Sequence, residues 1–536
     1  MYDYNNCLNL YVLYIINYNY LIMRVLWIDD EIDLLKPLII FLENKGYEID
    51  ISNNGVEGVE MFKNNKYSAV LLDENMIGLS GLEVLNIINE LDYNIPIIMI
   101  TKSEEENIME DAIGNKISDY LIKPVNPNQI LLSLKKALSQ TKLVSERTLT
   151  NYQQEFRKIS NDLSCANSYQ DWINLYLKLI YWELQLNDAD ESTMEEILIS
   201  QKTECNNSFS KFIDNNYEDW VKGFENKPLL SNSLISERLI KDICPNQKTL
   251  FIVIDNLRYD QWKTIEPNIL KYYNKQLEEP YFSILPTATQ YARNALFSGL
   301  MPLDIKNKFP QYWKFDHEDG GKNLYENELL QENLKQLGLS NLKNEYFKIT
   351  NLKNGKKFED EFKSKSDNDL ITLVYNFVDM LSHSKTEMEM IKELASNDKS
   401  YRSLTTSWFN NSPLMGVIKQ AAELNFKLII TTDHGTINVK TPTKVIGNKD
   451  LSSNLRYKTG KSLSFNYKEV VSFMEPNKIG LPSVSINSPF IFAKEDSFFA
   501  YPNNFNHYVS YFKDTYQHGG ISMEEMIIPY VVLDPK

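Results

Sequence analysis

The stretch Val25-Leu26-Trp27-Ile28-Asp29-Asp30-Glu31 decides the fold of the first part of this chain. Its four apolar residues predict a buried strand, and its acidic residues stand where that strand ends. Asp73, Thr101 and Lys123 each follow a later apolar run in the same way. Because the carboxyl ends of parallel strands meet at one edge of an open α/β sheet, these side chains are expected to share a crevice.

The predicted crevice combines three carboxylates with one hydroxyl and one ammonium group. That set suits Mg²⁺ and a phosphoryl group carried on an aspartate. A single acid at a strand end is more simply explained as a solvated cap, but four strand ends in the right order favour a phosphorylation switch. Asp73 is the predicted phosphorylated residue. The predicted magnesium ligands are Asp29, Asp30, Asp73 and Asn75.

The other polar residues of the crevice have predicted roles in the switch. Lys123 and the metal would neutralise the oxygens of the incoming phosphoryl group. Phosphorylation adds strong acceptor oxygens, so Thr101 would rotate to bond one of them and Tyr120 would fill the space that it leaves. We expect the Lys123–Pro124 peptide bond to be cis, which would aim the lysine at the site.

The motifs around these residues resemble those of two-component receiver domains. The resemblance rests on residues 28–31, 73–76, 99–102 and 119–124, and it covers the whole of the first domain. The family often has proline where this chain has Ile77, a departure that affects the stiffness of the loop but not the chemistry. Five β/α units of this kind predict a doubly wound, flavodoxin-like sheet.

At 536 residues, the chain is long enough for several domains. Residues 1–22 match neither a signal peptide nor a membrane span and are predicted to be a disordered or non-native extension. The receiver pattern occupies residues 23–142. Residues 143–245 show apolar spacing near 3.6, which predicts a helical bundle linker. Strands return over residues 246–536, which predicts a larger α/β domain.

The composition narrows the class of protein. A net charge of -16 argues against general affinity for nucleic acids or membrane surfaces. No segment is expected to cross a bilayer. The cysteines are scattered without a CxxC pair, which indicates a reducing compartment rather than a disulfide framework, so a cytoplasmic location is expected. They are Cys7, Cys165, Cys205 and Cys244.

The larger α/β region contains acids and histidines in a second pattern. Three apolar runs end at acids, and the run 371–378 is predicted to be a strand that ends at Asp379. Carboxylates and imidazoles together suit Zn²⁺ or Mn²⁺. The set is too large for one tetrahedral site, so it predicts a two-metal centre able to clamp a phosphoryl transfer. The candidate ligands are Asp255, Asp379, His383, Asp433, His434 and His518.

A nucleophile candidate lies in the segment 285–294, where Thr287 and Thr289 precede a predicted helix over residues 292–300. A hydroxyl at a helix N-terminus is well placed to meet a phosphate group. It becomes nucleophilic if a metal ion lowers its pKa. The simpler alternative is that both threonines only cap the helix.

Taken in order, this set resembles the PglZ-type domain of the alkaline phosphatase superfamily. The resemblance implies that Thr289, rather than Thr287, is the catalytic nucleophile. Arg293 and Asn294 are candidates for binding the phosphate group. The resemblance implies one zinc ion bound by Asp255, Thr289, Asp433 and His434, and a second bound by Asp379, His383 and His518.

A basic stretch follows Asp433 and His434 in the sequence. Such a stretch is either a solvated loop or a track for a phosphodiester backbone. It contains Lys440, Lys444, Lys449, Arg456, Lys458 and Lys461, with only Asp450 opposing them.

The order of receiver, helical bundle and PglZ-type domain resembles that of PorX-like response regulators. The resemblance implies a sensor histidine kinase as phosphodonor, a homodimer on phosphorylation, and control of type IX secretion or envelope genes. It also implies zinc-dependent hydrolysis of phosphodiesters or phosphate esters, with nucleotides or oligonucleotides as substrates.

Two alternatives remain at the level of the sequence. The PglZ-type domain could be mainly a protein-docking module, for example for a sigma factor, with metals that serve structure. A DNA-binding transcription factor is a weaker alternative, because the sequence shows no helix-turn-helix output domain and is acidic overall.

Overall fold

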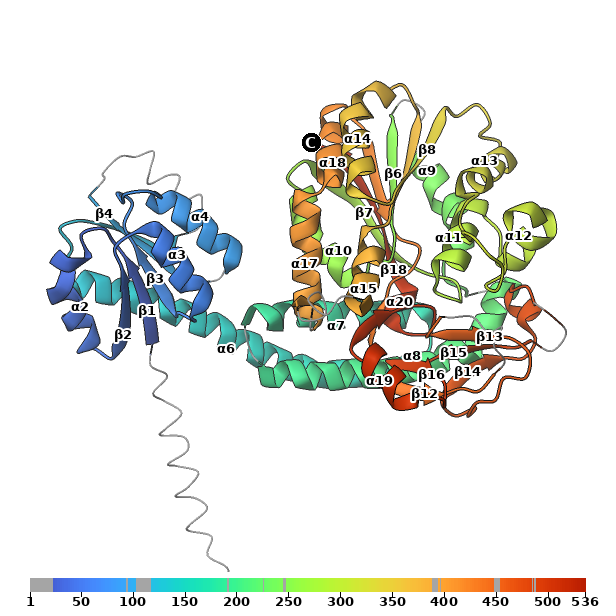
Figure 1. Cartoon of the computed structure of the whole chain (residues 1–536), viewed down its shortest axis with the longest axis horizontal. Helices are drawn as coiled ribbons and strands as arrows, with labels where there is room; N and C mark the ends of the chain where they lie inside the picture. The colour runs from blue at the N-terminus through green and yellow to red at the C-terminus, as the bar shows by residue number, and fades with distance from the viewer. Residues whose placement is uncertain are drawn as a thin grey trace, which may run out of the picture. The chain divides into compact units, whose positions relative to one another are not determined.

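The chain is described by a computed structural model, shown in Figure 1. Contacts divide it into two compact units, Met1–Gln153 with Asp188–Asp190, and Gln154–Asn187 with Glu191–Lys536. Side chains of residues 139–150, 153, 188–193 and 383–387 are not described. The expected extension over residues 1–22 falls outside the described residues, which are 23–92, 95–102, 117–189, 192–224, 226–243, 247–387, 394–395, 397–447, 454–483, 485 and 488–536.

The first unit is an α/β domain built on a five-stranded sheet of order β2-β1-β3-β4-β5 (Figure 1). All four strand pairs are parallel, and this order is the flavodoxin-like one. The predicted doubly wound fold is therefore confirmed. The strands are β1 Met23–Ile28, β2 Tyr47–Ser52, β3 Ala69–Leu72, β4 Ile97–Thr101 and β5 Asp119–Ile122, and the helices between them include η1 Ile32–Leu35, α2 Lys36–Glu43, α3 Gly55–Asn64 and α4 Gly81–Leu91.

Both faces of this sheet are covered, which explains the unbroken apolar runs in the sequence. Successive residues of a strand point to opposite faces. Val25 and Trp27 of β1 therefore join the core under α2 and the start of α6. Leu26 and Ile28 join the core under α3 and α4. In β1 and β3 the acids therefore come where the strand leaves this double cover, at its carboxyl end.

A long helix, α6 Pro127–Cys165, follows the sheet without a break. The sequence predicted a helix over residues 127–138 and a domain boundary after residue 142; the structure extends that helix through the boundary. Two further helices, α7 Tyr169–Ala189 and α8 Ser192–Lys222, follow. In the part of the chain that the structure describes, no helix is both long and apolar enough to cross a bilayer.

The second unit is built on a six-stranded mixed sheet of order β7-β18-β10-β6-β9-β8. Strands β10, β6, β9 and β8 run parallel, whereas β18 is antiparallel to both of its neighbours. The predicted larger α/β domain is confirmed. Its main strands are β6 Thr249–Ile254, β7 Tyr273–Phe282, β8 Asn344–Ile349, β9 Leu370–Tyr375, β10 Lys427–Thr431 and β18 Ile527–Pro535.

Helices cover this sheet on both sides. In Figure 1, α14, α17 and α18 lie on one side of the strands and α11, α12 and α13 on the other. The helices and helical turns are η2 Ser231–Ser233, η3 Ile235–Leu239, α9 Ile240–Asp242, α10 Tyr259–Ile269, α11 Thr289–Ser298, α12 Pro302–Lys308, η4 Pro310–Tyr312, α13 Glu326–Gln336, α14 Leu352–Glu361, η5 Phe362–Lys365, α15 Phe377–Glu387, α17 Asp398–Asn411 and α18 Pro413–Glu423.

A region of short strands lies between β10 and β18 in sequence. It contains the pairs β11–β17 and β12–β16 and the three-stranded sheet β13-β15-β14. Its elements are β11 Ile437–Val439, β12 Thr441–Lys444, β13 Tyr457–Thr459, β14 Val470–Phe473, η6 Pro476–Ile479, β15 Phe490–Ala493, β16 Ser497–Ala500, α19 Phe505–Phe512, β17 Thr515–Gln517 and α20 Met523–Met526.

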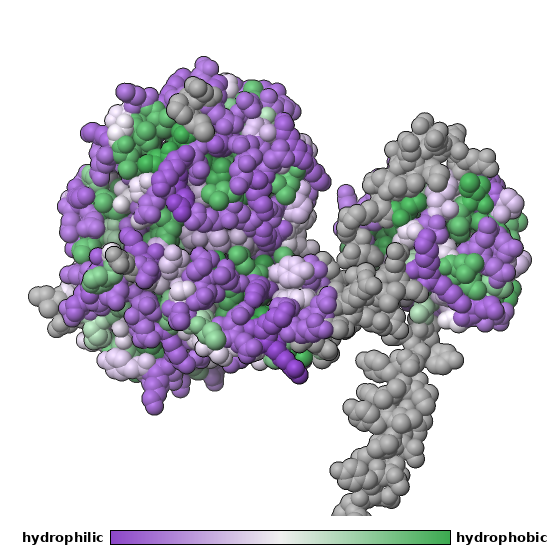
Figure 2. All heavy atoms as spheres, turned by 180° about the vertical axis from the view of Figure 1, so that it is seen from behind, coloured by the Kyte–Doolittle hydropathy of each residue, from purple (hydrophilic) through white to green (hydrophobic). Residues whose placement is uncertain are grey.

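The linker helices α7 and α8 share a core with the second sheet. Trp172 of α7 packs against Phe209 of α8, with ring centroids 5.4 Å apart. Phe209 and Trp220 both pack against Phe282 at the end of β7. These aromatic contacts explain why the helices belong to the same compact unit as the α/β region. The remaining surface is mostly polar: on the face drawn in Figure 2, hydrophilic side chains surround smaller hydrophobic patches.

A buried ion pair fastens the segment before β13 to the short helix α20, which precedes the C-terminal strand. Arg456 Nη2 lies 2.6 Å from Glu525 Oε2, and neither side chain is exposed. We predict that Arg456→Met lowers the free energy of unfolding by about 3–5 kcal/mol, because it leaves the glutamate charge buried without its partner.

Arg238→Met is the matched control for this measurement. Arg238 pairs with Glu279 through two contacts, but both side chains are about one third exposed (31% and 33%). Its loss is expected to cost about 1 kcal/mol or less. Chemical denaturation of the two variants measures both values, and equal losses would contradict the prediction.

Candidate functional site

The first crevice forms at the carboxyl edge of the parallel sheet. Asp29 and Asp73 follow the paired strands β1 and β3. Lys123 follows β5 and reaches both acids: its Nζ lies 2.7 Å from Asp29 Oδ2 and 2.9 Å from Asp73 Oδ2. Burial disfavours the charged lysine, but the two carboxylates outweigh burial and raise the pKa of Lys123. Burial also raises the pKa of Asp29.

The acids of the crevice fit a hard cation. Asp29, Asp30 and Asp73 each place a carboxylate oxygen within 4.8 Å of the others. Among the described residues, Asp73 Oδ1 is buried without a hydrogen-bond partner. A buried orphan oxygen beside two further carboxylates is the donor set that Mg²⁺ prefers. Asn75 lies alongside, and its Nδ2 donates to Thr101 Oγ1 at 3.4 Å.

The structure brings the predicted switch residues to the same edge. Thr101 ends β4 and is fully buried. Tyr120 in β5 is half-buried, and burial, followed by the charges of Glu74 and Asp73, raises its pKa. The Lys123–Pro124 peptide bond is cis, as expected. Sequence reasoning missed Gly81: a Cβ there would overlap the carbonyl oxygen of Asp73, so only glycine lets α4 start this close.

The second site is assembled from elements far apart in the sequence. Asp255 follows β6, and Asp433 and His434 follow the neighbouring strand β10. Asp379 differs from its predicted place: β9 ends at Tyr375, and Asp379 stands in the first turn of α15. The apolar residues Phe377 and Val378 belong to that helix rather than to the strand.

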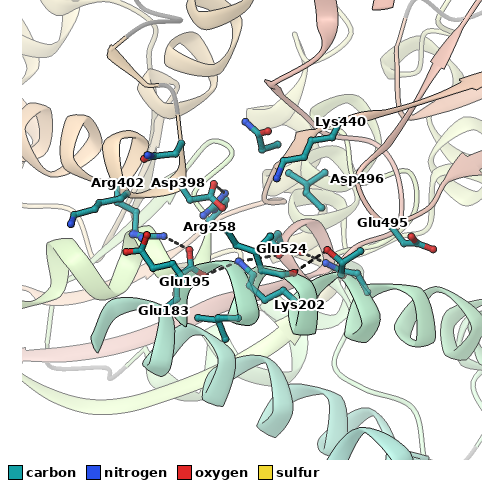
Figure 3. Close-up of a pocket in the computed structure, with 18 of the residues that line it drawn as sticks. Glu183, Glu195, Lys202, Arg258, Asp398, Arg402, Lys440, Glu495, Asp496 and Glu524 are labelled. Carbon is teal, nitrogen blue, oxygen red and sulfur yellow. Dashed lines mark hydrogen bonds and ion pairs between the residues drawn. The ribbon is translucent and has the colours of Figure 1, made fainter. Parts of the chain in front are cut away.

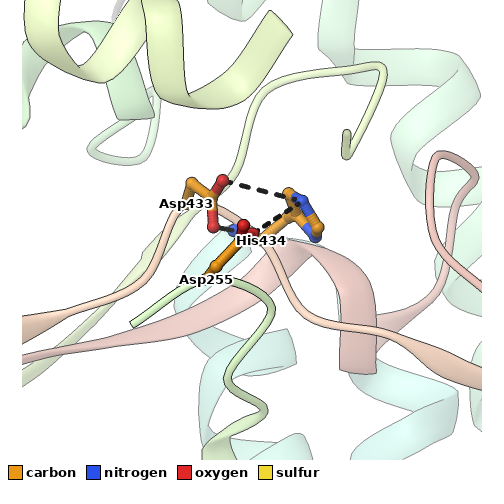
Figure 4. A group of neighbouring side chains, drawn as sticks. All are labelled: Asp255, Asp433 and His434. Atoms are coloured by element: carbon orange, nitrogen blue, oxygen red, sulfur yellow. Dashed lines mark hydrogen bonds and ion pairs between the residues drawn. The ribbon is translucent and has the colours of Figure 1, made fainter. Parts of the chain in front are cut away.

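Four of the predicted ligands converge at the ends of β6 and β10. Asp255, Asp433 and His434 place their donor atoms within 4.8 Å of one another, and all three are buried. Figure 4 shows their side chains pointing toward one another. Thr289 Oγ1 lies 3.0 Å from His434 Nε2 and 3.4 Å from Asp255 Oδ1. The threonine is the first residue of α11, three residues before the predicted start.

A second pair of predicted ligands adjoins this group. His518 Nε2 lies 3.6 Å from Asp379 Oδ1. The His518 ring stacks on the His434 ring, with centroids 4.3 Å apart. His383 stands on the same helix as Asp379, but its side chain falls outside the described residues. The structure thus places the two groups side by side.

The orientation of both histidines fits metal binding. His434 Nδ1 lies 3.0 Å from the carbonyl oxygen of Gly435, and His518 Nδ1 lies 3.2 Å from that of Thr287. A carbonyl oxygen can only accept, so these contacts assign the ring proton to Nδ1. The Nε2 atom of each ring therefore carries no proton, and its lone pair faces carboxylate groups of the site. A lone pair facing carboxylates favours a cation between them, and carbonyl-bound Nδ1 is the usual arrangement of zinc-binding histidines.

Arg293 supplies one positive charge to this acidic site. Its fully buried guanidinium contacts Asp255, and its Nε lies 3.0 Å from Asp433 Oδ2. A third carboxylate, Glu326, lies 3.5 Å from Nη1. Burial raises the pKa of Asp255 well above its usual range, and Arg293 only partly offsets this effect. The guanidinium of Arg293 therefore pairs with the carboxylates of the predicted metal ligands in this structure.

The remaining predicted residues have other neighbours. Asn294 Nδ2 donates to the carbonyl oxygen of Lys322, and Asn294 Oδ1 accepts from Asn323. Thr287 Oγ1 accepts from the N–H of Gly519 at 3.0 Å and donates to the carbonyl oxygen of Gly520 at 2.9 Å. The Thr287 hydroxyl is thus used to hold the loop that carries His518, whereas Thr289 faces His434.

Comparisons with known families agree with this geometry. Residues 235–533, more than half of the chain, match the family described as the BREX system PglZ alkaline phosphatase-like domain. The chain belongs to this PglZ family. Residues 142–221 match the PorX response regulator linker domain and residues 25–135 the response regulator receiver domain. The chain therefore has the PorX-like architecture that the sequence predicted: a response regulator with a receiver domain, a PorX-type linker and a PglZ domain.

Two curated relatives each match about a fifth of the chain, a length close to that of the receiver domain. The chain is 35% identical over 119 residues to the uncharacterized transcriptional regulatory protein YkoG of Bacillus subtilis, covering 22% of this chain and 51% of the relative. It is 31% identical over 118 residues to the transcriptional regulatory protein SrrA of Staphylococcus aureus, covering 22% and 48%. The chain spans about half the length of these relatives.

Solved structures also match this part of the chain. The response regulator TrrA of Thermotoga maritima is 32% identical, with a TM-score of 0.20, covering 21% of this chain and 97% of that one. A receiver domain protein of Methanospirillum hungatei is 27% identical, with a TM-score of 0.22, covering 22% and 95%. Receiver domains bind Mg²⁺ and take a phosphoryl group from a histidine kinase, and alkaline phosphatase-like domains are metalloenzymes.

Sequence reasoning missed two residues that shape the PglZ site. Asn256 has a left-handed backbone with φ of 65°. Its N–H donates to Asp433 Oδ1, and its side chain donates to Ser382 Oγ on α15 at 2.8 Å, so it ties three site elements together. The Asp-Asn pair after an apolar run was a usable turn signal. Gly435 is the second: a Cβ there would overlap the carbonyl oxygen of Glu524.

The basic stretch does not form one exposed face. Lys440, Lys444 and Lys461 are exposed, whereas Arg456 and Lys458 are buried. Lys449 and Asp450 fall outside the described residues. Lys458 Nζ stands 5.1 Å from the centre of the Tyr501 ring. Burial lowers the pKa of the Lys458 ammonium to about 8.

This lowered pKa predicts a pH-dependent stability. Below about pH 8 the folded protein holds a buried ammonium whose usual pKa is near 10.5. We predict that Lys458→Met raises the free energy of unfolding near neutral pH, by on the order of 3 kcal/mol at most. The gain should shrink as pH rises from about 8 toward 10.5, because the native lysine then becomes neutral.

Urea denaturation of wild type and Lys458→Met at about pH 7 and pH 10 measures this effect. Lys461→Met, at an exposed lysine of the same stretch, should show no such change with pH. A Lys458→Met difference that is the same at both pH values would contradict the prediction.

Proposed function

We propose that this chain is a response regulator in which phosphorylation of Asp73 controls a zinc-dependent phosphodiesterase or phosphatase. One observation carries the proposal: Thr289 Oγ1 lies 3.0 Å from His434 Nε2, at the start of α11 and beside the buried carboxylate of Asp255. A hydroxyl at a helix N-terminus among carboxylates and imidazoles is the arrangement expected of a nucleophile for phosphoryl transfer.

The residues present fit two zinc ions. Asp255, Thr289, Asp433 and His434 would hold one, and Asp379 and His518, with His383 on the same helix, would hold the other. Bound zinc would supply a lowered pKa for the threonine hydroxyl and positive charge for the phosphoryl oxygens.

The chain's own groups carry the chemical steps. Thr289 Oγ1 gives its proton to a water molecule and attacks phosphorus, so that an Oγ–P bond forms and the bond to the leaving oxygen breaks. That water passes the proton to the leaving oxygen. A second water then attacks phosphorus, the Oγ–P bond breaks, and a proton of this water returns to Thr289 Oγ1, which releases phosphate or a phosphate monoester. Arg293 holds Asp255 and Asp433 in place throughout, since its guanidinium contacts both. The positive end of the α11 dipole favours the anionic phosphoryl group.

We extend the proposal to nucleotide or oligonucleotide phosphodiesters as substrates and to control of secretion or envelope genes. A sensor histidine kinase would be the phosphodonor, and phosphorylation would favour a homodimer. The crevice of Asp29, Asp73 and Lys123 supports phosphorylation of the receiver domain. It combines a buried carboxylate oxygen that has no hydrogen-bond partner with a lysine ammonium that would neutralise a phosphoryl group.

Substitution of the nucleophile tests the catalytic proposal. Thr289→Ala should lower the rate of hydrolysis of a chromogenic phosphodiester, with Zn²⁺ present, by roughly 10³-fold or more. Thr289→Ser keeps the hydroxyl and is the matched control, which should retain much of the rate. Equal rates for wild type and Thr289→Ala would exclude this mechanism.

Substitution of Asp73 tests the regulatory proposal. Asp73→Asn should take up no phosphate from acetyl phosphate and Mg²⁺, because an amide cannot attack phosphorus. Asp33→Asn, at an exposed acid of the same domain, should take up phosphate as wild type does. Addition of the phosphodonor should change the hydrolysis rate of wild type and of Asp33→Asn but not of Asp73→Asn. Uptake by Asp73→Asn would place phosphorylation elsewhere.

A further inference from the structure

A pocket of about 350 Å³ lies where the linker helices α7 and α8 meet the PglZ domain. Figure 3 shows charged side chains from both sides of this boundary directed toward one another. The pocket is lined by Glu183 and Lys202 of the linker and by Arg258, Asp398, Arg402 and Glu524 of the PglZ domain. None of these residues has a role in the proposed phosphoryl transfer.

Two linker residues hold α20. Lys202 Nζ lies 2.7 Å from Glu183 Oε2 on α7 and 3.4 Å from Glu524 Oε1 on α20. Asn206 Nδ2 donates to Glu524 Oε2 at 2.9 Å, and Asn206 Oδ1 accepts from the N–H of Met523 at 2.8 Å. The amide thus makes a two-sided contact with one short helix. Lys202, Asn206 and Glu524 are all buried.

The backbone of α20 supports the turn that carries His434. The N–H of Gly435 donates to the carbonyl oxygen of Glu525 at 3.0 Å. A Cβ at Gly435 would overlap the carbonyl oxygen of Glu524, which shows how closely the turn rests on the helix. A displacement of α20 therefore has to move the His434–Gly435 turn, because close-packed groups transmit displacement.

A second branch of the same network starts at Glu183. Its Oε1 accepts from Arg402 Nη1 at 2.5 Å, and that nitrogen also lies 2.8 Å from Asp260 Oδ2. Asp260 in turn pairs with Arg258, whose Nε donates to Asp260 Oδ1 at 2.8 Å. Arg258 follows Asp255 in the loop after β6.

The branch continues to the loop that carries His518. Arg258 Nη1 lies 2.7 Å from Asp398 Oδ1, which also accepts from the Tyr516 hydroxyl at 2.7 Å. Tyr516 lies in β17, directly before the His518 loop. The contacts that begin on the linker therefore end at the loops of three predicted metal ligands: Asp255, His434 and His518.

We propose that Lys202 and Asn206 of the linker are positioning residues of the metal centre. They fix α20 and, through it, the direction in which His434 faces Asp255. The linker is then part of the support of the catalytic site, and a shift of α8 is a means of changing that site. This inference rests on the proposed metal centre and deepens it by naming how the site is regulated.

Zinc affinity of the full chain tests the proposal. Asn206→Ala and Lys202→Met should each weaken zinc binding, measured by competition with a chromogenic chelator, by about 10–100-fold. In the hydrolysis assay kcat should fall while KM stays within about twofold, because the substrate contacts are untouched. Lys202→Arg keeps the charge and should restore most of the affinity.

Lys178→Met is the matched control on the same linker. Lys178 of α7 also forms an ion pair, with Asp162 Oδ2 at 2.5 Å, but both side chains are more than 40% exposed (43% and 45%). The pair lies outside the pocket at the PglZ domain. This variant should keep the zinc affinity of wild type.

The outcome is decided on folded protein. Thermal unfolding of the metal-free variants shows which of them fold. If Lys202→Met does not fold, the test rests on Asn206→Ala alone. Zinc affinity within about twofold of wild type in a folded Asn206→Ala would overturn the proposal. Zinc binding without any ester hydrolysis in wild type would instead reject the proposed function, while the affinity comparison would still stand.

Discussion

The candidate metal site depends on one interaction: the buried carboxylates of Asp255 and Asp433 pair with the buried guanidinium of Arg293. Asp255 and Asp433 have no exposed surface, and an isolated buried carboxylate would be strongly destabilising. Arg293 of α11 contacts both of them. This pairing fixes α11 against the ends of β6 and β10 and thereby sets Thr289 beside His434. Three carboxylates, Asp255, Asp433 and Glu326, share this one guanidinium, which suits the binding of a further cation.

The receiver crevice uses the same device with a different cation. Lys123 lies within 3 Å of Asp29 and Asp73, as Arg293 does with Asp433. The two cations differ in a way that suits each site. The lysine ammonium is a point charge on a flexible stem, which suits a site where a phosphoryl group is proposed to arrive on Asp73. The planar guanidinium holds two carboxylates in a fixed relation, which suits a site whose ligands have to stay in place.

The linker helices are bound to the PglZ domain by two kinds of contact. Aromatic rings of α8 pack against the end of β7, and Trp172 of α7 packs against one of those rings. The charges of Glu183, which is partly buried, and of Lys202, which is buried, meet arginine and carboxylate side chains of the PglZ domain. Apolar packing is non-directional and supplies cohesion, whereas a buried ion pair fixes one geometry. The combination makes α8 a rigid neighbour of the site.

The sequence by itself determined the fold class and the order of the strand-end acids. Unbroken apolar runs such as 25–28 and 250–254 predict buried parallel strands, because the middle of a strand covered on both faces is apolar. The acids that follow these runs therefore reveal the edge of each sheet. The local sequence pattern did not locate the ends of elements as well. The run 371–378 contains β9 and the first residues of α15, and apolar residues are compatible with both a strand and a helix.

Only the tertiary structure decided what each polar residue touches. Arg293 bonds to Asp433 across 140 residues of chain, and Lys458 is buried although Lys461 is exposed. It also decided that α6 continues through the expected boundary and that α8 contacts α20. Periodicity reports which face of an element is buried, but the partner on that face depends on how distant segments pack, and that information is not local.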